Sequence, residues 1–598
     1  MGTKMIKDPV HGYIKIHNDY MKDIIDSCEF QRLRNIRQTS YDSLYPGSSH
    51  SRFIHSLGVY YLGSKAFTAF RRNVEEQERM KSKAKNLNWE SLKHTFELAC
   101  LLHDVGHTPF SHTGEDFLLF EKEVDKFEIM KGILRQKEQP TICALYNNLL
   151  TTLEDSLSEK AFADILEDFA KTVEGSKSYI SGKKVANPHE IMSVIVSIDT
   201  YGKYFEKEKV DIDLFARMIL GICYNDLSNF KTGVKNVLIQ LLNSSIIDVD
   251  RLDYIIRDTQ MSGFDSTSID IERLLESVTL IHDQQKCIYC MGYKKNALST
   301  IVNVVLAHDA ERRWIQAHPI VMYDSFLIKQ CINAVEKEFK AKEDSKSIFQ
   351  QKAFTTQGIQ LENGLVLRLM NDGDFIFLMK QIKEDNPMRY YVDEYLSRDK
   401  RRSPIWKSEA EFRLLLNELT KAQRKILMDT FAAEGEKNAG NSIGSTLNRE
   451  RIKELEEEIR KMEGDADADD EDLQNTIMNR KRQLFWLEKL KDFFSKINKD
   501  SDFNIYNQKT DVFRSKINSL SALGVEIWYD QFQKAESIKD VLSLYNTDED
   551  TEEKKTKNGD SIRLFYFYIE KNEMFKIEDF IKFLKDTLEE YENEFIKE

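Results

Sequence analysis

Between residues 101 and 112 the chain has the sequence LLHDVGHTPFSH, which gathers three histidines and an aspartate in one short segment. The full chain of 598 residues has only 12 histidines, so a quarter of them lie here. Imidazole and carboxylate groups are the usual ligands and proton carriers of metal-dependent hydrolases. The segment therefore predicts a hydrolytic metal site, and the alternative is a polar helix end that arose by chance.

A histidine–aspartate pair occurs at 103–104, 282–283 and 308–309, so the pair alone is weak evidence. Only the first pair has further candidate ligands, which are His55 at the start of a predicted helix and Asp250 in IIDVDRLDYIIRD. Such a set suits Mn, Fe, Zn, Ni or Mg and leaves coordination positions open for water and phosphate oxygen. We predict that one divalent metal ion is bound by His55, His103, Asp104 and Asp250.

The segment around Asp250 supports a site through its helical spacing. Asp250, Tyr254, Arg257 and Asp258 stand at i, i+4, i+7 and i+8, which puts them on one face of a helix. An acid, a phenol, a guanidinium and a second acid on one face are unusual for a core helix. The alternative is a solvated face with internal ion pairs.

The composition predicts a predominantly α fold, because Gly (24) and Pro (8) are few and helix-forming residues abound. We expect an extended segment over 1–17, a helical stretch over 18–38 and a helix that begins at His55. A further helix over about 90–103 should end at the histidine motif, and a second helical block should cover about 187–335.

Four regions are expected along the chain. They are a hydrolase domain over 1–335 with an insertion at about 116–186, a smaller mixed α/β lobe over 336–445, a helical hairpin or coiled coil over 446–498, and a C-terminal region of unknown role over 499–598. The hairpin prediction depends on apolar residues in a/d register. These are Ile452, Leu455, Ile459 and Met462 in the first helix and Leu473, Ile477, Leu484 and Leu487 in the second.

Charge and cysteine content exclude several classes of protein. The formal net charge of −14 does not favour a protein whose main role is to grip nucleic acid phosphates. Seven scattered cysteines and an N-terminus without an apolar signal region favour the cytoplasm. No apolar run approaches the ~18 residues of a membrane span, so no membrane partner is expected.

Several ordered motifs carry a family resemblance. DPVHGYIKIH, FQRLRNIRQT, YPGSSHSRFIHSLGV, LLHDVGHTPFSH, NPHE and DVDRLDYIIRD resemble the HD-domain deoxynucleoside triphosphate triphosphohydrolases, such as the bacterial dGTP triphosphohydrolases and the mammalian SAM- and HD-domain enzyme. The later DGDFIFLMKQI and VDEYLSRDKRRSPIWKS resemble the lobe that follows the HD domain in that family. The resemblance covers roughly residues 4–115 and 187–410. It implies a mainly α protein with an HD-domain helical core, a smaller mixed lobe and a C-terminal helical or coiled-coil region.

The resemblance also implies roles for individual residues. The metal ligands fall on the same four positions that coordination chemistry selects. The histidines that line the catalytic site match His107, His112 and His189, and His112 is the first choice to protonate the leaving 5′ oxygen. The substrate-binding positions match Gln38, Arg52, Arg251, Tyr254 and Asp258. Arg251 departs from the lysine that the family usually has, and a second tyrosine near the sugar falls near Gln316, which puts strict selection of deoxyribose in question.

Regulation is a further expectation from the resemblance. The guanine-nucleotide effector site of the mammalian enzyme maps onto Lys4, Asp26 and Arg34. The alternative is that Asp26 and Arg34 are an ordinary surface pair at i, i+8 of one helix. A nucleotide effector, a homo-oligomer (dimer, tetramer or hexamer) and a protein partner for the C-terminal region are expected.

The resulting hypothesis is a metal-dependent hydrolase that cleaves dNTPs, with dGTP as a plausible substrate, to deoxynucleoside and triphosphate, and that acts in antiviral (anti-phage) dNTP depletion. Two alternatives stay open. One is another HD phosphohydrolase, a phosphodiesterase or nucleotidase, and the other is a non-catalytic nucleotide sensor.

Overall fold

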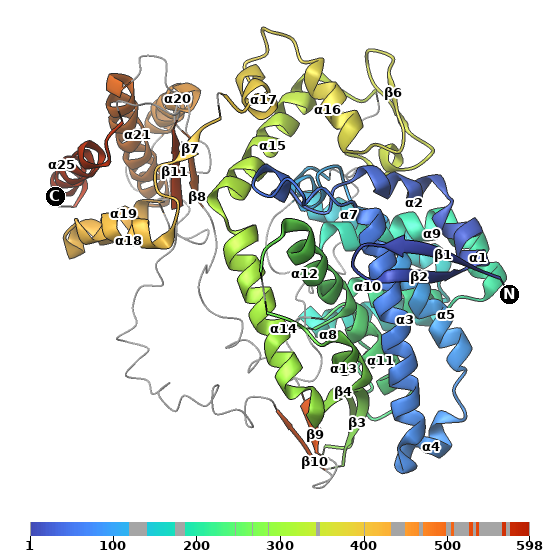
Figure 1. The fold of residues 1–598 in the computed structure, drawn as a ribbon. Coiled ribbons are helices and arrows are strands. Elements are labelled where there is room, and N and C mark those ends of the chain that lie inside the picture. The colour runs from blue at the N-terminus through green and yellow to red at the C-terminus, as the bar shows by residue number, and fades with distance from the viewer. Residues whose placement is uncertain are drawn as a thin grey trace. The chain divides into compact units, whose positions relative to one another are not determined.

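The protein is described by a computed structural model, whose fold is drawn in Figure 1. The mainly α prediction is confirmed, since helices make up most of the described chain and the sheets are small. The described residues are 2–118, 140–173, 186–244, 247–265, 267–284, 286–342, 347–399, 401–431, 449–465, 471–497, 504–507, 526–529, 534–537, 565–569 and 575–596.

The chain divides into two compact units. The first contains Met1–Gln316, Ile328–Arg389 and Ser515–Asp548, and the second contains Ala317–Leu327, Tyr390–Arg514 and Glu549–Glu598. All the predicted site residues lie in the first unit. The predicted domain limits at 335, 445 and 498 stay predictions.

The N-terminal segment is a β-hairpin followed by a broken helical stretch. Strands β1 (Thr3–Asp8) and β2 (Gly12–His17) pair antiparallel, with Asp8 opposite Gly12 at the turn. The continuous helical pattern expected over 18–38 is wrong. Ser27 is extended and accepts the N–H of Phe30 on its side chain, so it caps a new helix and interrupts the first. The pieces are α1 (Asn18–Tyr20), a π-helical turn (Met21–Ile25), α2 (Cys28–Arg32) and a 3-10 turn (Leu33–Asn35).

Three helices form the centre of the first unit. The long helix α3 (Arg52–Glu76) packs against both α5 (Trp89–Leu102) and α12 (Val249–Ser262) (Figure 1). Helix α3 starts at Arg52, earlier than the expected His55. The apolar side chains between these helices are almost fully buried, Phe67, Phe70 and Phe96 among them. Burial of each such side chain stabilises the fold by about 1.5–3 kcal/mol, which fixes the three helices that carry the site.

The other helices of the first unit surround this centre. They are α4 (Glu78–Ala84), α7 (Pro140–Ser156), α8 (Glu159–Val173), α9 (Pro188–Glu208), α10 (Ile212–Leu220), α11 (Phe230–Leu242), α13 (Ile271–Glu276), α14 (Leu298–Glu311) and α16 (Asp372–Lys380), together with the C-terminal part of α15 (Pro319–Glu338) from Ile328 onward. Of the insertion expected at 116–186, the structure describes 116–118, 140–173 and 186, and 119–139 and 174–185 lie outside the described residues.

Two small sheets complete the first unit. The four-stranded sheet has the order β10–β9–β4–β3, with the antiparallel pair β3 (Val278–Asp283) and β4 (Ile288–Lys294) joined by β9 (Glu526–Tyr529) and β10 (Lys534–Ser537). A two-stranded sheet pairs β5 (Ile359–Gln360) with β6 (Val366–Leu367).

The second unit combines a short sheet with a helical hairpin. The sheet has the order β7–β11–β8, from Ser403–Pro404, Phe565–Ile569 and Asn504–Asn507. Its helices are α17 (Arg389–Leu396), α18 (Glu409–Asn417), α19 (Lys421–Phe431), α20 (Arg449–Asp465), α21 (Glu471–Ile497) and α25 (Ile577–Phe595). Helices α20 and α21 pack against each other with Ile452, Leu455, Ile459 and Ile477 buried, as the a/d pattern predicts. The segment between these two helices, 466–470, lies outside the described residues.

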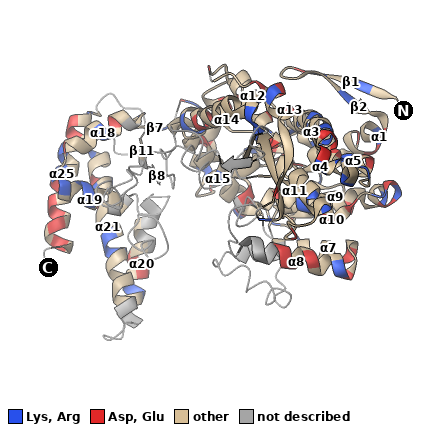
Figure 2. Cartoon of the chain, turned by 90° about the horizontal axis from the view of Figure 1, so that it is seen from below, with Lys and Arg blue, Asp and Glu red and all other residues tan. Residues whose placement is uncertain are grey.

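Charged side chains are interspersed over both units. Figure 2 shows Lys and Arg as well as Asp and Glu on both units, while acidic residues concentrate toward the C-terminal end of α25. Among the described helices, none is both long enough and apolar enough to cross a lipid bilayer.

The close approach of the histidine motif to α9 gives a first prediction. A Cβ atom at Gly106 would lie 2.3 Å from the Ser193 nitrogen and 2.5 Å from the Met192 carbonyl carbon. We expect Gly106→Ala to lower the free energy of unfolding by about 1–3 kcal/mol, the usual cost of overpacking, measured by urea denaturation. The control is Gly202→Ala within α9, where a Cβ meets nothing within 4 Å. That change should raise stability by ~0.5–1 kcal/mol, and equal effects of the two substitutions would contradict the prediction.

Candidate active site

Three helices bring the predicted metal ligands together. His55 lies in the first turns of α3, and His103 is the residue at which α5 ends, with Asp104 next in the chain. Asp250 stands in the first turn of α12, whose N-cap is Asp248. Because α3 packs against both other helices, its histidine faces the end of one and the start of the other.

His55, His103 and Asp250 bring their ligand atoms close enough together to hold one ion, and Asp104 adjoins them through both of its oxygens. The Nε2 atom of His55 lies 3.0 Å from Asp250 Oδ1 and 3.5 Å from Asp104 Oδ2. The Nε2 atom of His103 lies 3.5 Å from Asp104 Oδ1 and 3.7 Å from Asp250 Oδ1. His55, His103 and Asp104 are buried, whereas the Asp250 side chain is 38% exposed. The centre is therefore open on one side.

The donor atoms fit a divalent ion. The Nε2 atoms of His55 and His103 are buried and have no hydrogen-bond partner among the described residues. An unsatisfied buried nitrogen costs about 1–3 kcal/mol, and coordination to a metal removes that cost. The opposite ring nitrogens are both engaged, with His103 Nδ1 2.9 Å from the Cys100 carbonyl oxygen and His55 Nδ1 2.7 Å from Asp253 Oδ2. This is the arrangement that orients imidazoles toward a metal.

A buried network behind His55 holds it in place. Asp253 accepts hydrogen bonds from Arg257 Nε (2.8 Å) and Nη2 (2.9 Å) and lies 2.6 Å from His11 Nε2. Arg257 Nη1 also donates to Asp8 Oδ2 at 2.8 Å. Arg257, expected on a face with Asp250, thus supports the site from behind. The DPVHG segment is tied to the metal centre through this network.

Nearby charges control protonation at the metal centre. Burial raises the pKa of Asp104, but Arg52, His103 and His107 outweigh it and hold that pKa well below its usual range. Burial likewise raises the pKa of Asp250, and the two metal-site histidines more than reverse this. Burial lowers the pKa of His55, yet Asp250 and Asp253 together raise it to about 10. The carboxylates are therefore ionised at neutral pH, as metal binding requires, and a metal ion would displace the proton that they hold on His55.

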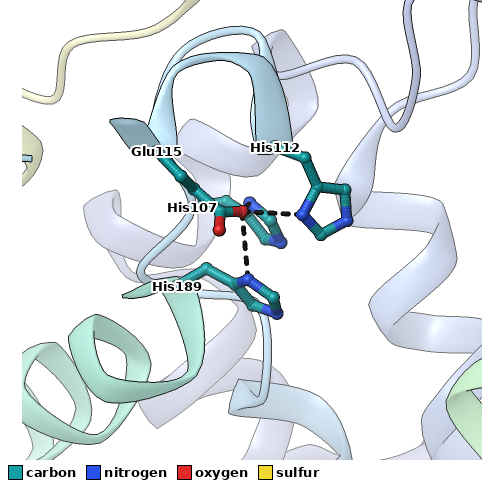
Figure 3. Close-up of side chains that lie close together, drawn as sticks. All are labelled: His107, His112, Glu115 and His189. Atoms are coloured by element: carbon teal, nitrogen blue, oxygen red, sulfur yellow. Dashed lines mark ion pairs between the residues drawn. The ribbon is translucent and has the colours of Figure 1, made fainter. Parts of the chain in front are cut away.

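The three predicted catalytic histidines form a second cluster around Glu115. Glu115 Oε1 lies 2.8 Å from His112 Nδ1, 3.0 Å from His189 Nδ1 and 3.5 Å from His107 Nδ1 (Figure 3). The rings of His107 and His189 stack with centroids 4.1 Å apart. His107 Nε2 is 3.2 Å from Asp104 Oδ1, which links this cluster to the metal centre.

Exposure and charge distinguish the members of the cluster. His107, Glu115 and His189 are buried, whereas the His112 side chain is 64% exposed. Burial raises the pKa of Glu115, but His189 and His112 outweigh it and hold that pKa well below its usual range. Burial and the Arg52 cation lower the pKa of His107. Only His112 therefore combines a buried carboxylate partner with access to solvent.

The loop between the two clusters has two left-handed residues and is held by hydrogen bonds from other segments. Phe110 and Ser111 have φ values of 59° and 52°, a left-handed conformation that costs a non-glycine residue about 1–2 kcal/mol. Asp372, the first residue of α16, accepts the Phe110 N–H at 2.8 Å and the Arg37 N–H at 2.9 Å. Arg32 donates to the carbonyl oxygens of Val105, His107 and Met370. Residues from the 370–372 segment thus hold the loop.

Two of the predicted substrate-binding residues lie directly beside the metal centre. Arg52 donates to Asp104 Oδ2 (2.7 Å), Ser111 Oγ (2.9 Å) and the Gln38 carbonyl oxygen (3.3 Å). The Gln38 side-chain oxygen is buried without a hydrogen-bond partner among the described residues. This atom is available to a ligand.

The other three predicted substrate-binding residues lie on α12. Arg251 and Tyr254 are half-buried, and burial raises the pKa of the Tyr254 phenol well above its usual value. Asp258 is buried 2.8 Å from His50 Nε2. Gln316, the position aligned with a second tyrosine, donates to Glu311 Oε1 at 2.9 Å.

The predicted effector residues are all exposed. Lys4 lies in β1, Asp26 ends the π-helical turn and Arg34 follows α2. Arg34 lies 3.6 Å above the Phe53 ring and donates to Gln31. The interpretation of Asp26 and Arg34 as an i, i+8 pair of one helix is wrong, because Ser27 interrupts that helix.

Four residues of the site were missed by the sequence analysis: His11, His50, Glu115 and Asp253. Each stands inside or next to a segment that already attracted attention, and Glu115 follows His112 by three positions. Their position within these motifs could have identified them as candidates. Their spacing and residue types alone do not distinguish them from neighbouring polar residues.

A match to a protein family agrees with this geometry. Residues 52–173, which begin with α3 and include His55, His103 and Asp104, match the model described as the HD domain. The match therefore identifies an HD domain within residues 52–173 of this chain. This HD-domain protein is 28% identical over 283 residues to the deoxynucleoside triphosphate triphosphohydrolase SAMHD1 homolog of Dictyostelium discoideum, over 47% of this chain and 41% of the relative. The resemblance expected from the motifs is confirmed.

Two further relatives extend the comparison. Human deoxynucleoside triphosphate triphosphohydrolase SAMHD1 is 40% identical over 110 residues, which is 18% of this chain and 16% of that one. The uncharacterized protein YwfO of Bacillus subtilis is 24% identical over 337 residues, or 56% of each chain. The HD-domain protein thus matches about half, or less, of the length of these relatives.

The Asp253 network gives a second prediction. Asp253→Asn removes the charge that fixes the His55 ring, so we expect metal affinity to fall about 10–100-fold. Equilibrium dialysis against Mn²⁺ measures the change, with the melting temperature recorded to verify folding. The control is Glu276→Gln, which removes an exposed carboxylate paired with Arg72. A folded Asp253→Asn protein with undiminished Mn²⁺ affinity would contradict the role assigned to this carboxylate.

Proposed function

We propose that this protein hydrolyses deoxynucleoside triphosphates to a deoxynucleoside and triphosphate with the help of a divalent metal ion. The observation that carries the proposal is the contact between two clusters, in which His107 Nε2 lies 3.2 Å from the metal-site carboxylate Asp104. Metal ligands and proton carriers therefore adjoin each other, as a phosphoester hydrolase requires. The printed names of the relatives support dNTPs as the substrate class.

Binding of the triphosphate is assigned to Arg52 and Arg251. The Arg52 guanidinium is buried and directed by Asp104 and Ser111, so its position is set before substrate arrives. Preorganised cations of this kind stabilise the charge that develops on phosphate in the transition state. Gln38 and Asp258 would bond the sugar 3′-hydroxyl, and Tyr254 would pack on the sugar. Close packing near C2′ disfavours a ribose hydroxyl.

The reaction needs a proton for its leaving group. His55, His103, Asp104 and Asp250 would hold a divalent metal ion, which would polarise phosphate oxygen and make a water molecule more nucleophilic. Water attacks the α-phosphorus, and the bond from that phosphorus to the 5′ oxygen breaks. His112 donates a proton to that oxygen, because its ring is exposed while its Nδ1 atom is held 2.8 Å from the buried Glu115. His107 and His189 orient Glu115 from the other side.

Regulation belongs to the same proposal. Lys4, Asp26 and Arg34 are exposed, so a guanine-nucleotide effector would bind there at the surface, and a second copy of the chain would complete the site. The expected biological role is depletion of dNTPs in defence against phage. A protein partner would bind through the C-terminal region.

Product analysis gives a third prediction. Purified protein with Mn²⁺ or Mg²⁺ and each dNTP, singly and in pairs, should yield deoxynucleoside and intact triphosphate, resolved by ion-pair chromatography. Turnover only in mixtures would support a nucleotide effector. Release of single phosphates, or hydrolysis of cyclic nucleotides instead, would favour another HD phosphohydrolase. The absence of any product would favour a nucleotide sensor.

The repeated histidine–aspartate pair offers a matched control for that assay. His103→Ala with Asp104→Ala should abolish turnover, because both side chains are assigned to the metal. His282→Ala with Asp283→Ala removes the same two side-chain types at the end of β3, and activity should be unchanged. Loss of activity in both double variants would point to a stability effect instead of a catalytic one.

A fourth prediction concerns Arg52. Lysine keeps the charge but cannot make the three separate contacts of the guanidinium with Asp104, Ser111 and Gln38. We expect Arg52→Lys to lower kcat/KM for dNTPs by about 100-fold, the loss typical when one preorganised donor is removed. Arg72→Lys on the exposed side of α3 serves as the control and should retain full activity. An active Arg52→Lys enzyme would contradict the assignment of Arg52 to phosphate.

A further inference from the structure

Glu115 and its three histidines have a geometry that proton transfer alone does not require. Three imidazoles direct the same ring atom, Nδ1, at a single carboxylate oxygen, at 2.8, 3.0 and 3.5 Å (Figure 3). One ligand atom from each of the four residues lies within 4.8 Å of those of the other three. A tetrahedral ion with ligand bonds of about 2.0–2.1 Å holds its ligand atoms about 3.3 Å apart. The three distances bracket that value.

The buried members of the cluster are poorly satisfied without a further group. His107 Nδ1, His189 Nδ1 and Glu115 Oε1 are buried and form close ion pairs, but these contacts do not have the geometry of a hydrogen bond. Buried polar atoms are normally paired, and each unpaired one costs about 1–3 kcal/mol. A cation among the four ligand atoms would satisfy all three at once.

The surroundings also suit a cation. His107 turns its other nitrogen, Nε2, toward Asp104 Oδ1 at 3.2 Å, which is the carboxylate–histidine contact that orients metal ligands. The nearby Arg52 is paired with Asp104 at 2.7 Å, so its charge is compensated. His112 is exposed, which gives an ion a path from solvent. Imidazole with one carboxylate is a donor set that Zn²⁺ binds well.

We propose that His107, His112, Glu115 and His189 form a second cation site, separate from the HD metal centre, that binds Zn²⁺. Bound Zn²⁺ occupies Nδ1 of His112 and ties this side chain to three others. Because the proposed function uses His112 as the proton donor, the inference that Zn²⁺ inhibits hydrolysis rests on that function. The binding site itself does not.

Binding stoichiometry tests the site without any assay of activity. Full-length protein is stripped with a chelator and titrated with Zn²⁺ in equilibrium dialysis. Wild type should bind two equivalents, Asp250→Ala should keep the second site only, and Glu115→Gln should keep the HD site only. The exposed His112 gives a variant with little effect on folding, and His112→Ala should weaken the second site at least about tenfold. His282→Gln, which removes a histidine outside both clusters, should still bind two equivalents.

Cobalt gives an independent readout of the same site. In the Asp250→Ala protein, Co²⁺ should show the intense visible absorption of a four-coordinate ion, and adding Glu115→Gln should abolish it. A single Zn²⁺ equivalent in wild type, unchanged by Glu115→Gln and lost with Asp250→Ala, would overturn the second site and leave the proposed function standing.

Activity separates the remaining outcomes. In the Mn²⁺-loaded protein, hydrolysis of dNTPs should fall as the Glu115-dependent equivalent of Zn²⁺ binds. Two bound equivalents without loss of activity would overturn the inhibition. Two equivalents in a protein that hydrolyses no dNTP would support the cation site and overturn the proposed function.

Discussion

A buried carboxylate shared by two imidazoles and a guanidinium is the contact on which the candidate metal centre depends. Asp253 holds the Nδ1 side of His55, so the Nε2 atom can face the other ligands. Arg257 neutralises that carboxylate and extends the network to Asp8. The N-terminal hairpin, α3 and α12 are therefore coupled through one charge cluster, and removing one partner would leave another buried charge uncompensated.

The candidate metal ligands could be predicted from the sequence, whereas the residues that hold them in position could not. His55, His103, Asp104 and Asp250 stand in motifs whose residue types predict a metal site, and the structure brings these side chains close together. Asp253 could not be separated from Asp250, because positions three apart on a helix share a face and either carboxylate fits the pattern. Glu115 was missed because its role depends on the folded loop, in which Phe110 and Ser111 turn left-handed.

In the fold, too, features set by local sequence pattern could be predicted, whereas features set by contacts distant in the sequence could not. Long amphipathic stretches such as α20, α21 and α25 were predictable, because their apolar spacing persists over many turns. The stretch over 18–38 has buried Phe30, Leu33 and Ile36, yet it is not one helix. A single serine, Ser27, caps a new helix there, and its hydroxyl also lies 2.6 Å from the Tyr201 hydroxyl on α9. That contact spans a long sequence separation, so local pattern could not reveal it.

Asp372 has a consequence for how the chain can be divided. Its two carboxylate oxygens accept N–H groups from Arg37 and Phe110, on two different loops of the site, and Met370 accepts from Arg32. A fragment that stops at residue 335 retains every predicted metal ligand but loses the clamp across those loops. The smallest fragment that folds like the full protein must therefore extend through α16. A shorter fragment would retain the histidine motif, but the loops that position its side chains would lose these hydrogen bonds.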